Sequence, residues 1–326
     1  MASDPKLTVA KAPSDTAVAQ RTTYEFNRAR DGIGAFFDSA GLTSGAVVLC
    51  PAYVGWSPNE GSGILDPLQE RGFDVHFYRL GPDLGIDLAH LRDELRGGEV
   101  AGLIVVPFFG RIPDGYAQAI ELGREFGAWT LEDEAHSLLT DLTEGTSGRA
   151  GHGAVFSLHK FFPLPDGGLL LINRDETSER NWTRRPEFAD LPHPEGRART
   201  LVNYDLAAIA TARKANAQLL MDLLREVEGE IDPLWPELRE GEVLQTLPTV
   251  VQQADRDQIY ESMNKSGFGV TSLYHSLVRN ITPEEFPDSH WLSKHILNLP
   301  IHQDASAAAL EQLVSQLVVT LRQRSG

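Results

Sequence analysis

Lys160 combines a side chain capable of covalent chemistry with a position at the end of a predicted strand. It follows the apolar segment 153–158, and Phe161 and Phe162 come directly after it. This apolar setting shields the amine from water, which lowers the pKa of a lysine and makes it a nucleophile. The alternative is a lysine that snorkels from the strand end into solvent.

A carboxylate stands at a second predicted strand end, in the segment Leu131-Glu-Asp133-Glu-Ala-His136. In open parallel sheets, ligands collect outside the carboxyl ends of the strands, so Asp133 and Lys160 are expected to meet there. A reactive amine and an ionised carboxylate are what a pyridoxal phosphate (PLP) enzyme needs. The amine forms a Schiff base with the cofactor, and the carboxylate keeps the pyridine nitrogen protonated. The alternative for Asp133 is a simple helix N-cap.

Strands and helices alternate through the first half of the chain, which predicts a mainly parallel sheet with helices on both faces. Apolar runs and helical spacing give the expected elements. The predicted strands are 46–50, 73–78, 100–106, 129–131, 153–158 and 168–173, and the predicted helices are 87–95 and 115–126.

The second half has a different pattern. Residues 174–200 are rich in Arg, Glu and Pro and are predicted to be a long excursion. A long helix is expected at 203–228, short strands at 246–252, 268–272 and 296–299, and a closing helix at 306–322. We therefore expect an N-terminal arm (residues 1–20), a large cofactor-binding domain (21–200) and a small C-terminal domain (201–326).

Composition limits the classes of function. The 326 residues are 41% hydrophobic and 23% charged, as in an ordinary globular protein. The net charge of −17 argues against a nucleic-acid partner. The polar N-terminal segment has no signal-peptide pattern and no apolar run has membrane-spanning length, so we expect a cytoplasmic protein without a membrane partner.

Other readings of the same residues are weaker. Asp133-Glu-Ala-His136 also matches the sequence of a helicase Walker B motif. A helicase is not expected, because the phosphate-binding loop that must precede this motif is missing from the sequence. The spacing of His136, His152 and His159 fits no usual zinc pattern, so no metal is expected. A nucleophile elbow for a hydrolase is also missing from the sequence.

Five motifs in the correct order resemble the DegT/StrS sugar aminotransferases, a family of fold type I PLP enzymes. They are Leu49-Cys-Pro51-Ala-Tyr53, Leu131-Glu-Asp133-Glu-Ala-His136-Ser, Phe156-Ser-Leu-His-Lys160 with Gly167-Gly168, Asn203-Tyr204, and Leu297-Asn-Leu-Pro300-Ile-His. The resemblance implies an α/β fold type I PLP-transferase. Its large domain has a mainly parallel seven-stranded sheet covered by helices, and its smaller C-terminal domain is α+β.

The resemblance also assigns cofactor-binding roles. Lys160 would carry PLP and Asp133 would face its ring nitrogen. His136 would approach the 3′ oxygen of the cofactor and Tyr53 would stack on its ring, although a packed core tyrosine is equally expected and Trp56 is a rival. Ser157 and the helix start at Ala29, Arg30 and Asp31 would bind the phosphate.

The implied reaction is transfer of an amino group from a small-molecule donor to a keto-sugar or another small carbonyl acceptor in a biosynthetic pathway. Asn203 would reach the site of a neighbouring subunit in a homodimer with shared active sites. Only Leu158 and His159 separate Ser157 from Lys160, which is shorter than the usual family spacing. This keeps open elimination, dehydration or carbon–carbon bond chemistry, as well as a non-catalytic relative.

Overall fold

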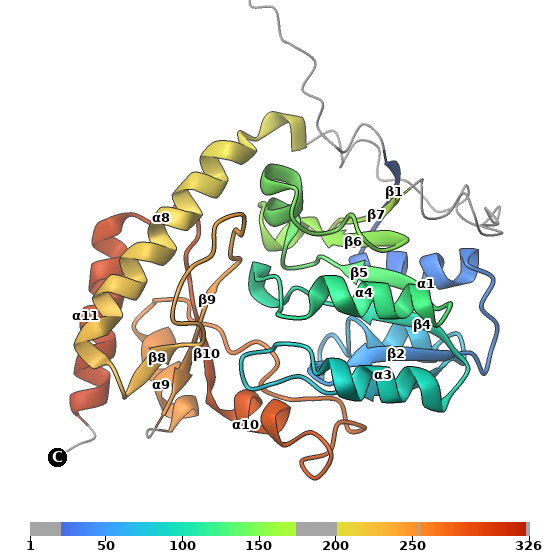
Figure 1. Ribbon diagram of the computed structural model, residues 1–326. Helices are drawn as coiled ribbons and strands as arrows, with labels where there is room; N and C mark the ends of the chain where they lie inside the picture. Colours follow the sequence, from blue (N-terminus) through green and yellow to red (C-terminus); the bar gives the residue numbers. More distant parts are fainter. Residues whose placement is uncertain (1–20, 174–200, 253–254, 324–326) are drawn as a thin grey trace, which may run out of the picture.

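The computed structural model describes residues 21–173, 201–252 and 255–323. The predicted arm at 1–20 and the predicted excursion at 174–200 lie outside the described residues. The described strands form a seven-stranded sheet and a separate three-stranded sheet. Figure 1 shows the large sheet with its helices on one side of the molecule, and the small sheet with the long helices α8 (Leu206–Leu224) and α11 (Ala307–Arg322) on the other.

The large sheet has the strand order β1-β7-β6-β5-β4-β2-β3. Its strands are β1 (Thr22–Phe26), β2 (Val47–Pro51), β3 (Asp74–Tyr78), β4 (Val100–Val105), β5 (Trp129–Asp133), β6 (Gly153–Ser157) and β7 (Gly168–Ile172). The five strands from β6 to β3 run parallel, while β7 is antiparallel to both β6 and β1. The predicted fold class, with its mainly parallel seven-stranded sheet, is confirmed, and the strand predicted at 168–173 is one of the two at the edge that break the parallel series.

Helices cover both faces of this sheet. They are α1 (Ala29–Ser39), α2 (Leu65–Gln69), α3 (Leu88–Gly97) and α4 (Tyr116–Glu125). Successive residues of a strand face opposite sides, and β4 shows this directly. A Cβ on Gly102 would meet Phe37 of α1, whereas the next residue, Leu103, lies against Gly123 of α4. The pair α1 and α2 therefore packs on one face, and α3 and α4 pack on the other.

Short polar side chains fix where the helices begin. The Asp87 carboxylate accepts hydrogen bonds from the backbone N–H groups of Ala89 and His90 at the start of α3. Ser306 caps the last helix in the same way, through Ala309. Such caps satisfy N–H groups that have no partner within the helix. The helices predicted at 87–95, 115–126 and 306–322 are confirmed within a few residues.

The C-terminal half packs around the three-stranded antiparallel sheet β10-β9-β8. Its elements are α8 (Leu206–Leu224), β8 (Ile231–Pro233), β9 (Leu247–Val251), α9 (Arg256–Lys265), α10 (Pro287–His295), β10 (Ile296–Leu299) and α11 (Ala307–Arg322). The strand predicted at 268–272 is wrong, because this segment makes only an isolated bridge between Thr271 and Asn298. The predicted domain boundaries stay a prediction.

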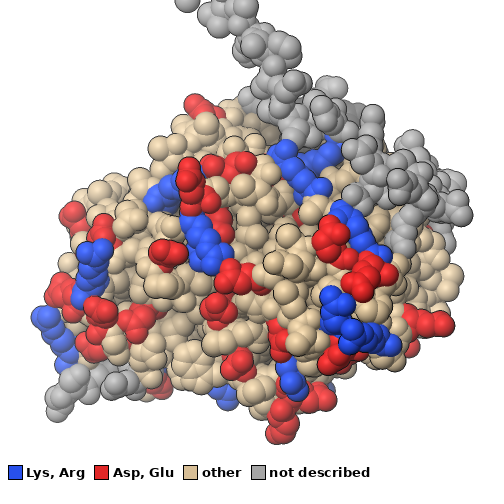
Figure 2. Space-filling model, viewed as in Figure 1, with Lys and Arg blue, Asp and Glu red and all other residues tan. Residues whose placement is uncertain are grey.

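Two further observations concern the surface. Within the described ranges, no helix has both the length and the apolar character needed to cross a membrane. Positive and negative side chains are interspersed over the described part of the face in Figure 2. A protein that binds nucleic acid through its phosphates gathers basic residues on one face, and this face has no such gathering.

Candidate active site

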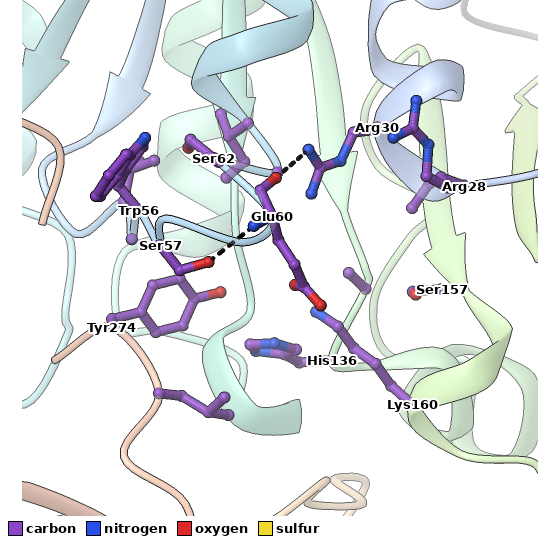
Figure 3. Close-up of a pocket in the computed structure, with 18 of the residues that line it drawn as sticks. Arg28, Arg30, Trp56, Ser57, Glu60, Ser62, His136, Ser157, Lys160 and Tyr274 are labelled. Atoms are coloured by element: carbon purple, nitrogen blue, oxygen red, sulfur yellow. Dashed lines mark hydrogen bonds between the residues drawn. The ribbon is translucent and has the colours of Figure 1, made fainter. Parts of the chain in front are cut away.

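The functional residues meet in a cavity of about 680 Å³ at the carboxyl ends of the parallel strands. The loop after β2 supplies one wall, and the ends of β5 and β6 supply the floor with Asp133, Ser157 and Lys160. The start of α1 and the distant segment 272–276 close the remaining sides. Figure 3 shows side chains from separate elements, among them Arg30, Lys160 and Tyr274, converging on the cavity.

Lys160 and Asp133 lie at the ends of neighbouring strands. Asp133 is the last residue of β5, and Lys160 ends the 3-10 turn η4 (Leu158–Lys160) that follows β6. Burial lowers the pKa of Lys160, and the negative charges of Asp133 and Glu60 oppose this effect. Burial raises the pKa of Asp133, and Lys160 opposes it. The structure thus brings the predicted amine and carboxylate into one shielded cavity, where each favours the charged form of the other.

Asp133 also has a local structural role. Its Oδ1 accepts the backbone N–H of Ala135 at 3.0 Å, much as an N-cap would. This bond orients the carboxylate at the turn that leaves β5. The two readings of Asp133 from the sequence are therefore compatible.

His136 lines the cavity and is held in a defined orientation. Its Nδ1 accepts the backbone N–H of Phe109 at 3.2 Å, and the two rings stack with centroids 5.5 Å apart. Because Nδ1 is an acceptor, the proton of the neutral ring is on Nε2. Burial, reinforced by the charge of Lys160, holds the pKa of His136 well below its usual value. His136 is therefore a neutral hydrogen-bond donor at Nε2.

The predicted phosphate-binding residues divide into two groups. Ser157, Ala29 and Arg30 line the cavity, together with Arg28, which the sequence analysis did not single out. Asp31 lies outside the cavity lining, which corrects its predicted place in the cradle. Its carboxylate accepts hydrogen bonds from Arg28, and its backbone N–H donates to the Arg28 carbonyl at 3.1 Å. An acidic residue turned away leaves the helix start free for an anion.

Tyr53 is a core residue in the structure. It is fully buried, packs edge-on against Phe108 at 5.5 Å and tilts against Tyr274 at 5.1 Å. Its rival Trp56 lines the cavity and is 47% exposed. The structure therefore favours the core interpretation of Tyr53 over the ring-stacking one.

Asn203 also lies outside the cavity lining. It is exposed at the end of the 3-10 turn η5 (Leu201–Asn203), next to Tyr204, which packs against Phe162 at 4.5 Å. Its expected contact with a neighbouring subunit stays a prediction.

Like Arg28, Glu60 and Tyr274 line the cavity but were not predicted from the sequence. Glu60 extends from the turn after β2 toward Lys160, and Tyr274 enters from the C-terminal half. Tyr274 has a left-handed backbone (φ 60°), which is costly for a bulky side chain and often marks functional sites. The polar turn Ser-Pro-Asn-Glu-Gly at 57–61 was a possible signal for Glu60, whereas nothing in the sequence marks Tyr274.

The comparison with known families identifies part of the chain. Residues 204–318 match a family model. The family of this model is the DegT/DnrJ/EryC1/StrS aminotransferase family. The curated proteins contain no significant match to this chain.

Solved structures extend the likeness to the DegT/StrS fold over nearly the whole chain. A DegT DnrJ EryC1 StrS aminotransferase from Brucella abortus is 18% identical, with a TM-score of 0.69 over 93% of this chain and 87% of that one. PseC from Helicobacter pylori, an aminotransferase involved in the biosynthesis of pseudoaminic acid, is 16% identical, with a TM-score of 0.73 over 94% and 88%. The GDP-4-keto-6-deoxy-D-mannose-3-dehydratase of E. coli, with bound hydrated PLP, is 16% identical, with a TM-score of 0.68 over 92% and 87%.

The predicted resemblance to the DegT/StrS family and the fold type I architecture are confirmed. The family that residues 204–318 match consists of aminotransferases, in agreement with the predicted class of enzyme, and one of the similar structures, the E. coli dehydratase, holds bound hydrated PLP. The residues of this chain also fit the cofactor. One cavity holds an amine, a buried carboxylate, a neutral histidine donor, and two arginines beside a helix start.

Proposed function

We propose that this chain is a PLP-dependent aminotransferase that transfers an amino group to a keto-sugar or another small carbonyl substrate in a biosynthetic pathway. The observation that carries the proposal is the meeting of Lys160 and Asp133 at neighbouring strand ends in one cavity. The family match of residues 204–318 supports it. When bound, PLP supplies an electron sink for the carbon that carries the amino group.

Each cavity residue has a distinct task in this proposal. Lys160 would hold the cofactor covalently, and its Nζ would accept and return the proton of the substrate carbon. Asp133 would stay ionised and would face the ring nitrogen. Its burial strengthens the attraction for a protonated nitrogen and excludes water as a competitor.

The remaining residues bind and orient. Arg28, Arg30 and the Ser157 hydroxyl line the part of the cavity beside the start of α1, where positive charge and helix N–H groups suit a phosphate. His136 offers its Nε2 proton to an oxygen of the bound cofactor. The aromatic cluster of Phe108, Phe109 and Tyr274 keeps water from one side of the cavity.

The visible spectrum of the purified protein tests the proposal. With PLP added, we expect an absorbance band that borohydride abolishes, and peptide mass analysis should then find the adduct on Lys160. A Lys160→Ala variant should lose the covalent adduct. Lys214→Ala removes a surface lysine that is paired with Glu144 and serves as a control that should retain it. An adduct on any other lysine would overturn the assignment.

Dehydration is a second candidate because of two observations. His159 lies in the cavity with its Nδ1 3.2 Å from the Ser157 hydroxyl, and one structural relative is a dehydratase. Mass analysis of the product formed from the carbonyl substrate separates the two reactions. A product that has lost one water and gained no nitrogen supports the second candidate, whereas a product in which an amino group replaces the carbonyl oxygen supports transamination.

The proposal includes a cytoplasmic homodimer with active sites shared between subunits. Sedimentation of the purified protein tests the oligomeric state. A Tyr204→Ala variant tests the shared site, since the resemblance places Asn203-Tyr204 near a neighbouring subunit. A monomer with full activity would contradict this part of the proposal.

A further inference from the structure

Glu60 stands at a tightly closed turn of the loop after β2. The backbone N–H of Ser57 donates to the Gly61 carbonyl at 3.1 Å, and the N–H of Gly61 donates back to the Ser57 carbonyl at 2.9 Å. The Ser57 hydroxyl oxygen accepts the N–H of Glu60 at 3.2 Å. The turn between these bonds has little freedom, so it presents Glu60 in a fixed direction.

Neighbouring elements brace this turn from two sides. Arg30, on α1, donates from Nη1 to the Glu60 carbonyl at 2.6 Å. The N–H of Trp56 donates to the Ser276 carbonyl at 2.9 Å. Gly61 has a left-handed backbone (φ 67°), and a Cβ there would lie 2.0 Å from the Asp66 carboxylate. The turn is therefore locked between α1, α2 and the C-terminal half.

The Glu60 side chain points across the cavity toward the end of Lys160 (Figure 3). Four other ionisable groups face this amine: Asp133 from β5, His136 from the turn after it, Arg30 from α1 and the adjacent His159. Only Asp133 and Glu60 among these carry negative charge. Once Asp133 is engaged by the ring nitrogen of the cofactor, Glu60 is the carboxylate of this group that remains for the amine.

We propose that Glu60 is a positioning residue whose carboxylate, directed across the cavity at the Lys160 amine, stabilises its ammonium form and thereby sets the pH at which this amine becomes a nucleophile. The inference rests on the proposed role of Lys160 as the reactive amine. Loss of the carboxylate leaves only the charge of Asp133 to oppose burial and Arg30, which both disfavour the charged amine. Lys160 then releases its proton at lower pH.

Competitive acetylation of the full-length, cofactor-free protein with acetic anhydride tests this inference. The extent of labelling at Lys160, read by peptide mass analysis across pH, gives the midpoint at which the amine loses its proton. In Glu60→Gln we expect the midpoint to fall, so that labelling below it rises about threefold or more. Glu60→Asp keeps the charge and should largely restore the wild-type midpoint.

Two further variants keep the result interpretable. Glu99→Gln removes the same charge from an exposed site outside the cavity lining and should leave the midpoint unchanged. Ser57→Ala loosens the turn without changing charge and should shift the midpoint in the same direction as Glu60→Gln, but less. It also serves as the test if Glu60→Gln does not fold.

An unchanged or higher midpoint in Glu60→Gln, or an equal shift in Glu99→Gln, would overturn the inference. Its failure is distinguishable from failure of the proposed function. The labelling midpoint is measured without cofactor, whereas the proposed function fails if the borohydride-fixed adduct forms on a lysine other than Lys160. A Glu60→Gln protein that still binds PLP at Lys160 with the wild-type midpoint refutes only the role of Glu60.

Discussion

Neighbouring residues at the end of β5 have different roles on the two faces of the sheet. Asp133 points into the cavity, while Glu132 and Glu134, the residue after β5, are fully buried on the other side, where the Tyr116 hydroxyl lies within hydrogen-bonding distance of both. Glu132 also accepts the backbone N–H groups of Ala150 and Gly151, and Glu134 accepts the Ser147 hydroxyl. The strand end that carries Asp133 is thus fastened from behind by hydrogen bonds.

The buried pair predicts a pH dependence of stability. Burial, with the charges of Glu132 and Asp141, raises the pKa of Glu134 well above its usual value, so the folded chain keeps a proton that the unfolded chain loses. The free energy of unfolding should therefore fall as pH rises above the ordinary carboxyl range. Urea unfolding at pH 5 and pH 8 measures this fall, which should be smaller in Glu134→Gln by about 1 kcal/mol or more.

The control for this prediction is Glu121→Gln, an exposed glutamate on α4. It should keep the wild-type difference between pH 5 and pH 8. Equal pH dependence in wild type and Glu134→Gln would show that Glu134 is not the group that holds the proton.

At the scale of elements, glycines fix how the loop after β2 meets the C-terminal half. A Cβ on Gly55 would lie 2.7 Å from the Tyr274 ring, whereas a Cβ on Gly63, in the same loop, would meet nothing within 4 Å. Gly55→Ala should displace Tyr274, lower stability by about 1–3 kcal/mol and weaken PLP binding.

Gly63→Ala is the matched control for this prediction, since it adds the same methyl group to the same cavity wall. Thermal unfolding and a PLP titration followed by absorbance measure both effects. If both variants lose the same stability and PLP affinity, any methyl group added to this loop is harmful. The contact between Gly55 and Tyr274 would then not explain the effect of Gly55→Ala.

Most of the large sheet could be predicted from apolar runs, because strands covered on both faces are apolar throughout. The direction of β7 could not be read from Gly168–Ile172 itself, since its residues are buried on both sides. The short link from Ser157 to Gly168 was a usable signal, because a parallel connection needs a dozen or more residues. Helices α9 and α10 were missed because polar residues dominate them.

Only some residues of the candidate site could be predicted from the sequence. The apolar runs in the sequence located the two strand ends near which Lys160, Asp133, His136 and Ser157 lie. All four residues line the cavity. Glu60 and Tyr274 depend on how a loop turns and on a contact between distant segments, which residue spacing does not encode. Tyr53 was ambiguous because a tyrosine beside a strand end suits either a core or a cavity.

At the scale of the whole molecule, ion pairs join the loop after β4 to the segment before β9. Arg111 and Glu242 are 3.3 Å apart and almost fully buried, with Arg111 also over the Trp235 ring. Arg239 and Asp114 form an exposed pair at 2.8 Å between the same parts of the chain. Burial lowers the pKa of Arg111, and the negative charge of Glu242 opposes this effect.

Removing the two acidic partners should have very different effects. Glu242→Gln leaves a buried guanidinium without its counter-charge and should cost about 3 kcal/mol of stability. Asp114→Asn breaks the exposed pair and should cost about 1 kcal/mol or less. Urea unfolding measures the loss of stability in both variants. Similar losses would contradict the interpretation of Arg111–Glu242 as a buried ion pair that stabilises the contact between the two segments.

The pairing of the two chain halves also bears on how the cavity is completed. The N–H of Val278 donates to the Val54 carbonyl at 3.0 Å, so one wall of the cavity comes from a segment that is distant in sequence from Lys160. Until that segment joins the loop after β2, one side of the cavity is open to water. Shielding of the Lys160 amine therefore depends on the assembled chain and not on its own strand end alone.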